Sequence, residues 1–198
     1  MPENNAIRPI VAPLPVDQWD ESLSYIVDDM NGKPINVHAL MANNPALLNA
    51  WWNFRNYSVK GGSLGQRKAE LVILRVAIHM GAWYEWGSHV ERSIACGINL
   101  EEIHNVRQGV PDQAWSEGEA FLLQCVDQLV ESHKIDEALL AELNKHYSTA
   151  QIMDIIAIHG MYVILGCMIN TWGLTLDQRV FDKLPEVVQQ AGEAPAFI

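Results

Sequence analysis

Apolar residues recur at helical spacing along most of this chain, whereas the strict apolar–polar alternation of strands is scarce. The Asn44-Pro45 pair is typical of a helix start and predicts a helix over 45–57, and residues 16–30 predict a weaker first helix. Residues 70–80 and 150–172 are apolar on nearly all sides, which is typical of central or interface helices. The pattern predicts an all-α helical bundle with seven or eight helices.

Helix ends are marked by polar caps and by glycines. Asp136 is the expected cap of a helix over 137–146, and Gly97, Gly109 and Gly173 stand where helices are expected to stop. Four further starts have a small polar residue answered three positions later by Glu or Gln, the pattern of a capping box: Ser63 with Gln66, Asn99 with Glu102, Ser116 with Glu119, and Ser148 with Gln151.

The length of 198 residues favours one domain, with a core large enough to fold without disulfides or metals. Residues 1–15 contain four prolines and predict an extended arm. Residues 1–40 are therefore interpreted as an N-terminal arm and first helix, part of the same domain as the helical body over 41–198.

Composition and charge restrict the partners. The chain is 49% hydrophobic and 19% charged, so we expect some apolar helical surface to be buried between subunits of a homo-oligomer. A net charge of −11 argues against nucleic acid and anionic membranes as partners. The N-terminus lacks an apolar signal core, and no uninterrupted run reaches the roughly 18 apolar residues of a membrane span, which predicts a cytoplasmic protein.

The cysteines and histidines lack the spacing of a disulfide framework or a metal site. Cys96, Cys125 and Cys167 are far apart in sequence and form no C-x-x-C pair, so each is expected to be a free thiol. No H-E-x-x-H or facial-triad pattern is present, so we expect no metal. His79 and His159 lie on apolar helices, where a hydrogen-bonded core position is the more common role of a histidine.

The candidate chemistry lies between Glu70 and His89. Glu85 and His89 are four residues apart and share one face of a helix, and Glu70 opens the apolar run before them. Two carboxyl groups and an imidazole can together hold and transfer protons. The alternative interpretation is an ordinary ion pair on a helix surface. The rarity of polar residues here favours a catalytic trio of His89, Glu85 and Glu70.

Substrate-binding candidates flank this trio. Arg75 lies inside the apolar helix and could bind a substrate carboxylate, although an arginine in such a place more often pairs with a neighbouring acid. Three aromatic residues are expected to crowd the site and to keep it partly dry, namely Trp83, Tyr84 and Trp86.

At these residues the chain resembles the carboxymuconolactone decarboxylase family, which includes the alkylhydroperoxidase D (AhpD) proteins. The resemblance rests on Glu70 through Arg75, the Tyr84-Glu85-Trp86 element followed by His89, and Gly97 with residues 100–103. It covers residues 45–130 most strongly and implies an AhpD-like all-α fold over 41–198. It also implies assembly as a trimer or hexamer, with active sites near subunit interfaces.

The resemblance implies enzymes of two kinds. In the peroxidase branch two cysteines stand between the matching Glu and His, but Ala82 and Glu85 occupy those positions here, so thiol peroxidase activity is disfavoured. The decarboxylase branch needs no metal or organic cofactor. It implies that His89 delivers a proton, that Glu85 and Glu70 position it, and that Arg75 anchors the carboxylate.

The sequence therefore predicts a cofactor-free acid–base enzyme that acts on a small carboxylated or lactone-like substrate, with decarboxylation as the leading reaction. Two alternatives remain open at this stage. One is an isomerase or dehydratase of a specialised pathway on the same fold. The other is a catalytically silent, oligomeric binding protein.

Overall fold

The computed structural model describes residues 11–107, 115–186 and 188. Across these residues the chain forms ten α-helices and two 3-10 helices, with no strand, in agreement with the predicted all-α class. The 3-10 helices are η1 (Val16–Gln18) and η2 (Glu21–Leu23). The α-helices are α1 (Ser24–Asp29), α2 (Asn36–Met41), α3 (Pro45–Val59), α4 (Gln66–Met80), α5 (Trp83–Ala95), α6 (Leu100–Arg107), α7 (Glu117–Ser132), α8 (Glu137–His146), α9 (Thr149–Trp172) and α10 (Gln178–Phe181).

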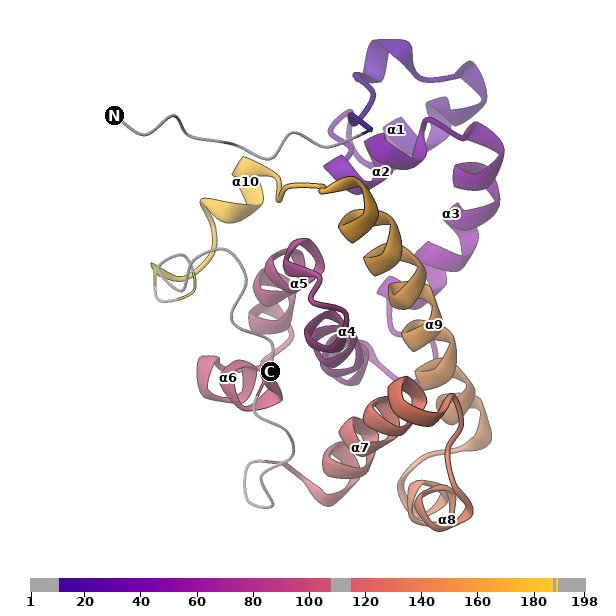
Figure 1. Ribbon diagram of the computed structural model, residues 1–198, viewed down its shortest axis with the longest axis vertical. Helices are drawn as coiled ribbons and strands as arrows, with labels where there is room; N and C mark the ends of the chain where they lie inside the picture. Colours follow the sequence, from indigo (N-terminus) through magenta and orange to yellow (C-terminus); the bar gives the residue numbers. More distant parts are fainter. Residues whose placement is uncertain (1–10, 108–114, 187, 189–198) are drawn as a thin grey trace.

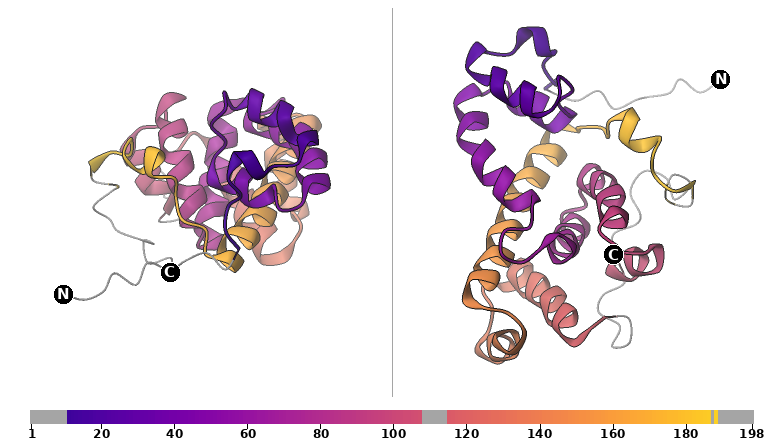
Figure 2. Two further views of the ribbon diagram at one scale, coloured as in Figure 1. Left: turned by 90° about the horizontal axis from the view of Figure 1, so that it is seen from above. Right: turned by 180° about the vertical axis from the view of Figure 1, so that it is seen from behind.

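Helix α4 lies at the centre of the bundle and packs mainly against α5, α9 and α7 (Figure 1). Every residue from Ala69 to Ile78 is buried, including the charged Glu70 and Arg75, as a segment that is apolar on nearly all sides predicts. The long α9 runs along one side, with α1–α3 at one end of the molecule and α7–α8 at the other (Figures 1 and 2). Helices α4, α5 and α9 are therefore the elements that can bring side chains together in the core.

The start of α4 differs from the expected capping box. The backbone N–H and the hydroxyl of Ser63 both donate to Oδ2 of Asp154, at 2.7 and 2.6 Å, so the Ser63 side chain cannot cap the helix. The helix begins instead at Gln66, after Gly65, whose φ of +89° favours glycine. A contact with a residue 91 positions later thus overrides the local pattern.

The other three predicted capping boxes and the helix ends expected at Asp136 and Gly173 are confirmed. Reciprocal capping bonds join Asn99 to Glu102, Ser116 to Glu119 and Ser148 to Gln151. The Asp136 side chain accepts from Leu139 N at 2.8 Å, and Gly173 ends α9 in the left-handed conformation. Gly109 lies outside the described residues.

The N-terminal region is more broken than predicted. The expected single helix over 16–30 consists of η1, η2 and α1, because the Asp20 side chain accepts from Ser22 N and starts a new turn. The short α2 and α10 were also not predicted, which accounts for the larger number of helices. The described end of the arm lies against α2, where Leu14 N donates to Ala39 O at 2.9 Å.

Helix α9 is long and apolar enough to cross a membrane by length and composition, but half of that apolar window is buried inside the protein. It packs against α3, α4, α5 and α7. These contacts are those of a core helix in a soluble-type helical fold. The three cysteines are free, as predicted.

Candidate active site

The structure brings Glu70, Glu85 and His89 together in the core. Helix α4 carries Glu70 and α5 carries the other two, and the side chains of all three are almost completely buried. The His89 Nδ1 atom lies 2.7 Å from Glu70 Oε2. The interpretation as a surface ion pair is therefore wrong, because no member of the group is on the surface.

The second ring nitrogen of His89 faces a tyrosine from α9. The Tyr162 hydroxyl oxygen lies 2.9 Å from His89 Nε2, and the two rings meet edge to face with centroids 5.0 Å apart. On the same side, Glu85 Oε2 lies 3.6 Å from His89 Nε2. Three helices thus supply the four groups of this cluster.

Burial controls the protonation of the imidazole. It lowers the pKa of His89, although the Glu70 carboxyl group opposes this effect, so the ring is neutral at neutral pH. Burial also raises the pKa of Tyr162 well above its usual value, so the phenol keeps its proton. We therefore assign the Nδ1–H as the donor to Glu70 and the Tyr162 hydroxyl as the donor to Nε2.

Glu85 has the opposite behaviour. Burial and, to a smaller extent, the nearby Glu70 raise its pKa to about 8, and Arg92 limits the rise. Glu85 therefore holds a proton at neutral pH. Its Oε1 atom is buried and has no hydrogen-bond partner among the described residues. The site thus offers a carboxylic acid beside a neutral imidazole.

Glu85, His89 and Tyr162 line a small cavity of about 20 Å³, which is room for about one water molecule. The half-buried residues at its rim are Ile35, Arg55, Val59 and Arg92. A larger occupant can enter only if rim side chains move. Buried His38 and Ser88 also line the cavity, and His38 Nδ1 and Ser88 Oγ lack partners in the described structure.

The sequence analysis missed four of the lining residues that have an ionisable side chain, namely Tyr162, Arg55, Arg92 and His38. Arg92 could have been found, because it follows Glu85 and His89 by seven and three positions and shares their helix face. The other three come from α2, α3 and α9, and no spacing along the sequence connects them to α5.

Arg75 is not brought to this cluster. It lies five residues after Glu70 on α4, which turns its side chain about 140° away. Its guanidinium binds both carboxylate oxygens of Asp127, at 2.6 and 3.0 Å, and the carbonyl oxygen of Val106. Asp127 also contacts His79 Nε2 at 2.6 Å. The contacts of Arg75 and His79 are those of a structural network between α4, α6 and α7.

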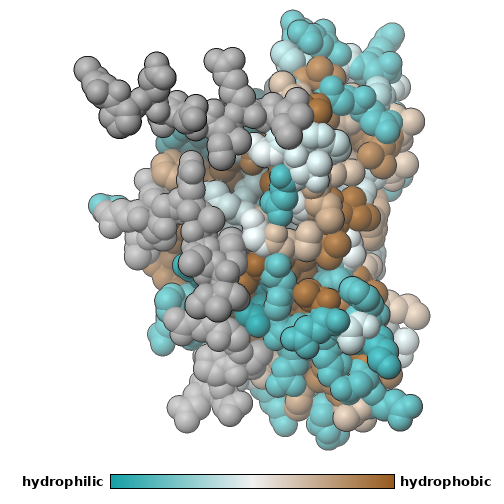
Figure 3. Space-filling model, in the orientation of Figure 1, coloured by the Kyte–Doolittle hydropathy of each residue, from teal (hydrophilic) through white to brown (hydrophobic). Residues whose placement is uncertain are grey.

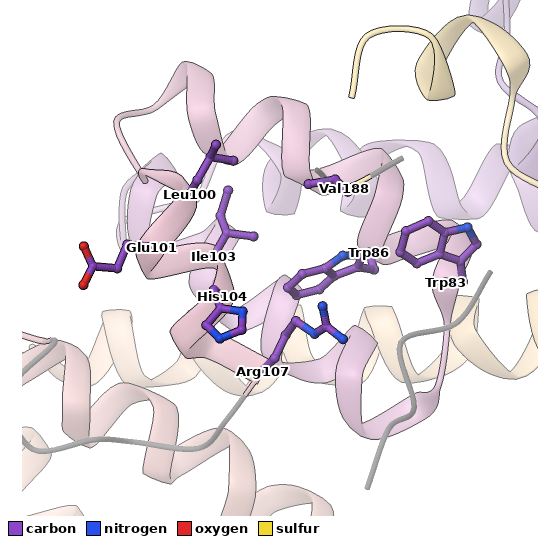
Figure 4. Close-up of a pocket in the computed structure, with 8 residues that line it drawn as sticks. All are labelled: Trp83, Trp86, Leu100, Glu101, Ile103, His104, Arg107 and Val188. Carbon is purple, nitrogen blue, oxygen red and sulfur yellow. The ribbon is translucent and has the colours of Figure 1, made fainter. Parts of the chain in front are cut away.

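The three aromatic candidates divide between two cavities. Tyr84 lines the first one, and its hydroxyl lies between Asp177 and the backbone of Val37. Trp83 and Trp86 line a second cavity of about 280 Å³ beside α6, where the Arg107 guanidinium lies 5.8 Å from the Trp86 ring (Figure 4). The expected crowding of the trio by all three rings is therefore wrong.

Neither the trio nor any other part of the described structure has three or more His, Cys, Asp or Glu side chains in a metal-binding arrangement. His159, on α9, does not line the first cavity. The described site thus consists of carboxyl, imidazole, phenol and guanidinium groups.

Comparison with known proteins supports the resemblance in sequence and in fold. Residues 45–126 match the sequence model of the carboxymuconolactone decarboxylase family. These residues span α3–α6 and the described start of α7, and they include Glu70, Glu85 and His89. No curated protein matches the chain.

Solved structures share the fold at low sequence identity. The debrominase Bmp8, solved as a variant with 2,3,4-tribromopyrrole, has a TM-score of 0.74 at 16% identity and covers 90% of this chain and 99% of its own. An uncharacterized peroxidase-related protein with an AhpD core from Ralstonia eutropha JMP134 has a TM-score of 0.74 at 18% identity, covering 89% and 98%. A peroxidase-related protein from Silicibacter sp. TM1040 has a TM-score of 0.71 at 16% identity, covering 88% and 96%.

Proposed function

Residues 45–126 match the carboxymuconolactone decarboxylase family and the fold is AhpD-like, and from that premise we propose that this chain is a cofactor-free acid–base enzyme acting on a small carboxylated or lactone-like substrate. Decarboxylation is the proposed reaction. The observation that carries the proposal is Glu85, a buried carboxylic acid that faces a cavity next to a neutral histidine.

The pKa directions favour Glu85 as the proton donor, in place of the role expected for His89. In a decarboxylation the C–C bond to the carboxylate breaks, carbon dioxide leaves, and the electron pair stays on the substrate carbon. The Glu85 O–H then protonates that carbon, which leaves Glu85 as a carboxylate. An acid with a pKa near the working pH is suited to this step.

His89 is suited to restoring the proton on Glu85. Its Nε2 is close to Glu85, and its Nδ1–H is fixed by Glu70. When the Tyr162 O–H turns away from Nε2, this nitrogen can take a proton from water to form the imidazolium, and it then passes that proton to the Glu85 carboxylate and returns to the neutral ring before the next turnover. Glu70 and Tyr162 hold the ring in this orientation and are positioning residues in this proposal.

The proposed function differs from the peroxidase activity that the names of some similar structures suggest. Ala82 and Glu85 stand where the peroxidase branch has its two cysteines, so this chain lacks the thiols that such a mechanism needs. Isomerisation or dehydration would use the same proton-transferring groups, so product analysis distinguishes them from decarboxylation. A silent binding protein would give no product.

We also propose that the protein is a cytoplasmic homo-oligomer, a trimer or a hexamer. Apolar side chains are exposed along one face of α9, including Met153 at 64% and Ile164 at 44%. Figure 3 shows hydrophobic side chains along the edge of the molecule where α9 lies. A continuous exposed apolar face supports burial against another copy of the chain.

The test is carbon dioxide release from gamma-carboxymuconolactone and related carboxy-lactones under metal-free conditions. We expect wild type to be active and His89→Ala and Glu85→Gln to lose about 10²- to 10⁴-fold, the usual contribution of general acid–base catalysis. Glu91→Gln is the matched control on the same helix, since Glu91 pairs with Lys183 at the surface. Absence of wild-type turnover on these lactones would contradict the decarboxylase proposal.

A further inference from the structure

Two guanidinium groups lie at the rim of the acid–base cavity, Arg55 from α3 and Arg92 from α5. Burial lowers the pKa of Arg55, and Arg92 lowers it further, so the two cations are close enough to repel each other. Neither forms a salt bridge with a carboxylate of the described residues, although the chain has 24 acidic residues. Asp29 opposes this lowering but forms no salt bridge with Arg55, and two adjacent cations without a directly paired carboxylate indicate a site for an anion.

Arg55 is held ready for such a ligand. Its guanidinium lies over the Trp52 ring, 5.0 Å from the centroid, and its Nη1 donates to Asn56 Oδ1 at 2.8 Å. The Trp52 indole is itself fixed by a 2.8 Å hydrogen bond from Nε1 to Asp29. Since an arginine has five N–H donors, most of those on Arg55 remain available to a ligand.

The interior of the cavity lacks polar partners as well. His38 is buried edge-on against Trp52, and burial together with the two arginines lowers its pKa to about 3, so its ring is neutral. Its Nδ1 atom and the Ser88 hydroxyl, both buried and both lining the cavity, have no hydrogen-bond partner in the described structure. Unpaired buried polar groups are costly, which indicates that a polar ligand completes the site.

We propose that Arg55 and Arg92 bind a carboxylate of the substrate at the cavity rim, and that His38 supplies a third polar contact. Planar guanidinium groups match the two oxygens of a carboxylate. The site is adjacent to Glu85, so a substrate held there presents its reacting carbon to the proposed acid.

This inference rests on the proposed function for the identity of the substrate, but binding can be measured without turnover. The probe is sodium acetate, titrated into the full-length protein by calorimetry against sodium chloride at equal ionic strength. Removing one charged partner should weaken acetate binding by about tenfold or more in Arg55→Gln and in Arg92→Gln.

Arg107→Gln is the matched control. Arg107 is also stacked on a tryptophan, but it lines the second cavity, so we expect its acetate affinity to stay within about twofold of wild type, as for an independent site. Equal affinity in wild type and both rim variants would overturn the inference. Loss of binding only in Arg107→Gln would also overturn it, because the anion would then bind in the second cavity.

Two further variants separate the possible failures. Arg92→Lys keeps the charge and should show a smaller loss than Arg92→Gln, with near-ultraviolet circular dichroism as the check on folding. Glu85→Gln should bind acetate while lacking turnover. Arginine-dependent acetate binding without wild-type carbon dioxide release would refute the proposed reaction and leave the anion site standing. If the rim variants changed neither turnover nor acetate binding, the anion site would be refuted and the proposed reaction would stand.

Discussion

The Nε2 atom of His89 lies 3.6 Å from Oε2 of Glu85, and this contact joins a neutral imidazole to a protonated carboxyl group. On a surface, the same four-residue spacing would give a charged pair. Burial reverses this outcome because it disfavours the charged form of both groups. The pair can therefore exchange protons with a substrate, whereas a tight ion pair would already have transferred its proton.

The pH dependence of turnover should follow Glu85. Its pKa of about 8 means that the acid form is lost as the pH rises through that value. We expect kcat/KM to fall on the alkaline side, with a midpoint near that pKa. A steady-state pH profile checks this, and a profile that is flat across this range would exclude Glu85 as the proton donor.

The same carboxyl group should make stability depend on pH. Folded Glu85 keeps its proton up to about pH 8, whereas the ordinary value is 4.5, so between these values the folded state binds more protons than the unfolded state. The free energy of unfolding should therefore fall as pH rises through this window, by up to about 1.4 kcal/mol per pH unit from this group.

Urea denaturation of wild type and Glu85→Gln at several pH values isolates this contribution. The variant cannot ionise at this position, so its stability relative to wild type should rise between about pH 5 and pH 8. A constant difference across the window would mean that Glu85 is ionised in the folded protein.

Tyr162→Phe should change the pKa of the His89 imidazole and have only a small effect on the stability of the fold. The hydroxyl donates to His89 Nε2 and stabilises the neutral ring, so its removal should raise the pKa of His89 and cost about 1 kcal/mol of stability. The NMR titration of the His89 ring measures the first effect. Tyr147→Phe is the control, because its hydroxyl donates to Gly118 O away from the site. An equal response of His89 to both variants would count against the assigned hydrogen bond.

Sequence patterns predicted the fold class, and helical spacing placed Glu85 and His89 on one face of α5. Glu70 lies on α4, so its grouping with them came from its nearness in sequence and from the family resemblance. The pattern could not identify Tyr162. Helix α9 is apolar on nearly all sides, so nothing in its sequence distinguishes the face toward α5 from the others. The remaining differences between the predicted and the observed helices come from contacts between distant segments. Ser63, for example, donates hydrogen bonds to Asp154 and does not cap α4.

Arg75 illustrates the limit of a prediction from residue type alone. An arginine in an apolar helix can be a ligand for a substrate or, more often, a partner for an internal acid, and the sequence does not show which acid would pair with it. The structure pairs it with Asp127, and the two side chains are 9% and 24% exposed. The role of Arg75 depends on Asp127, which lies on another helix. The helical periodicity of α4 carries no information about the position of Asp127.

Arg75→Met is therefore expected to lower stability and leave substrate binding unchanged. Breaking a buried pair costs about 3–5 kcal/mol, and the partial exposure of Asp127 places the expected loss near the lower end. Urea denaturation measures it, with Arg179→Met as an exposed control whose Nη2 donates only to backbone carbonyls. A raised KM without a loss of stability would instead support the carboxylate-binding role expected from the sequence.

The exposed face of α9 gives the prediction on assembly. Met153, Ile156 and Ile164 recur at helical spacing on this face, and Gly160 between them borders open space where a side chain would begin, so a helix from another copy could approach closely there. Ile164→Glu places a charge in such an interface and should shift the mass measured by light scattering toward that of one chain. Leu140→Glu is the control, because Leu140 is a similarly exposed apolar residue on α8. A carboxylate buried against an apolar helix is too costly to be tolerated without dissociation. If wild type is oligomeric and Ile164→Glu has the same mass, the interface therefore lies on another surface.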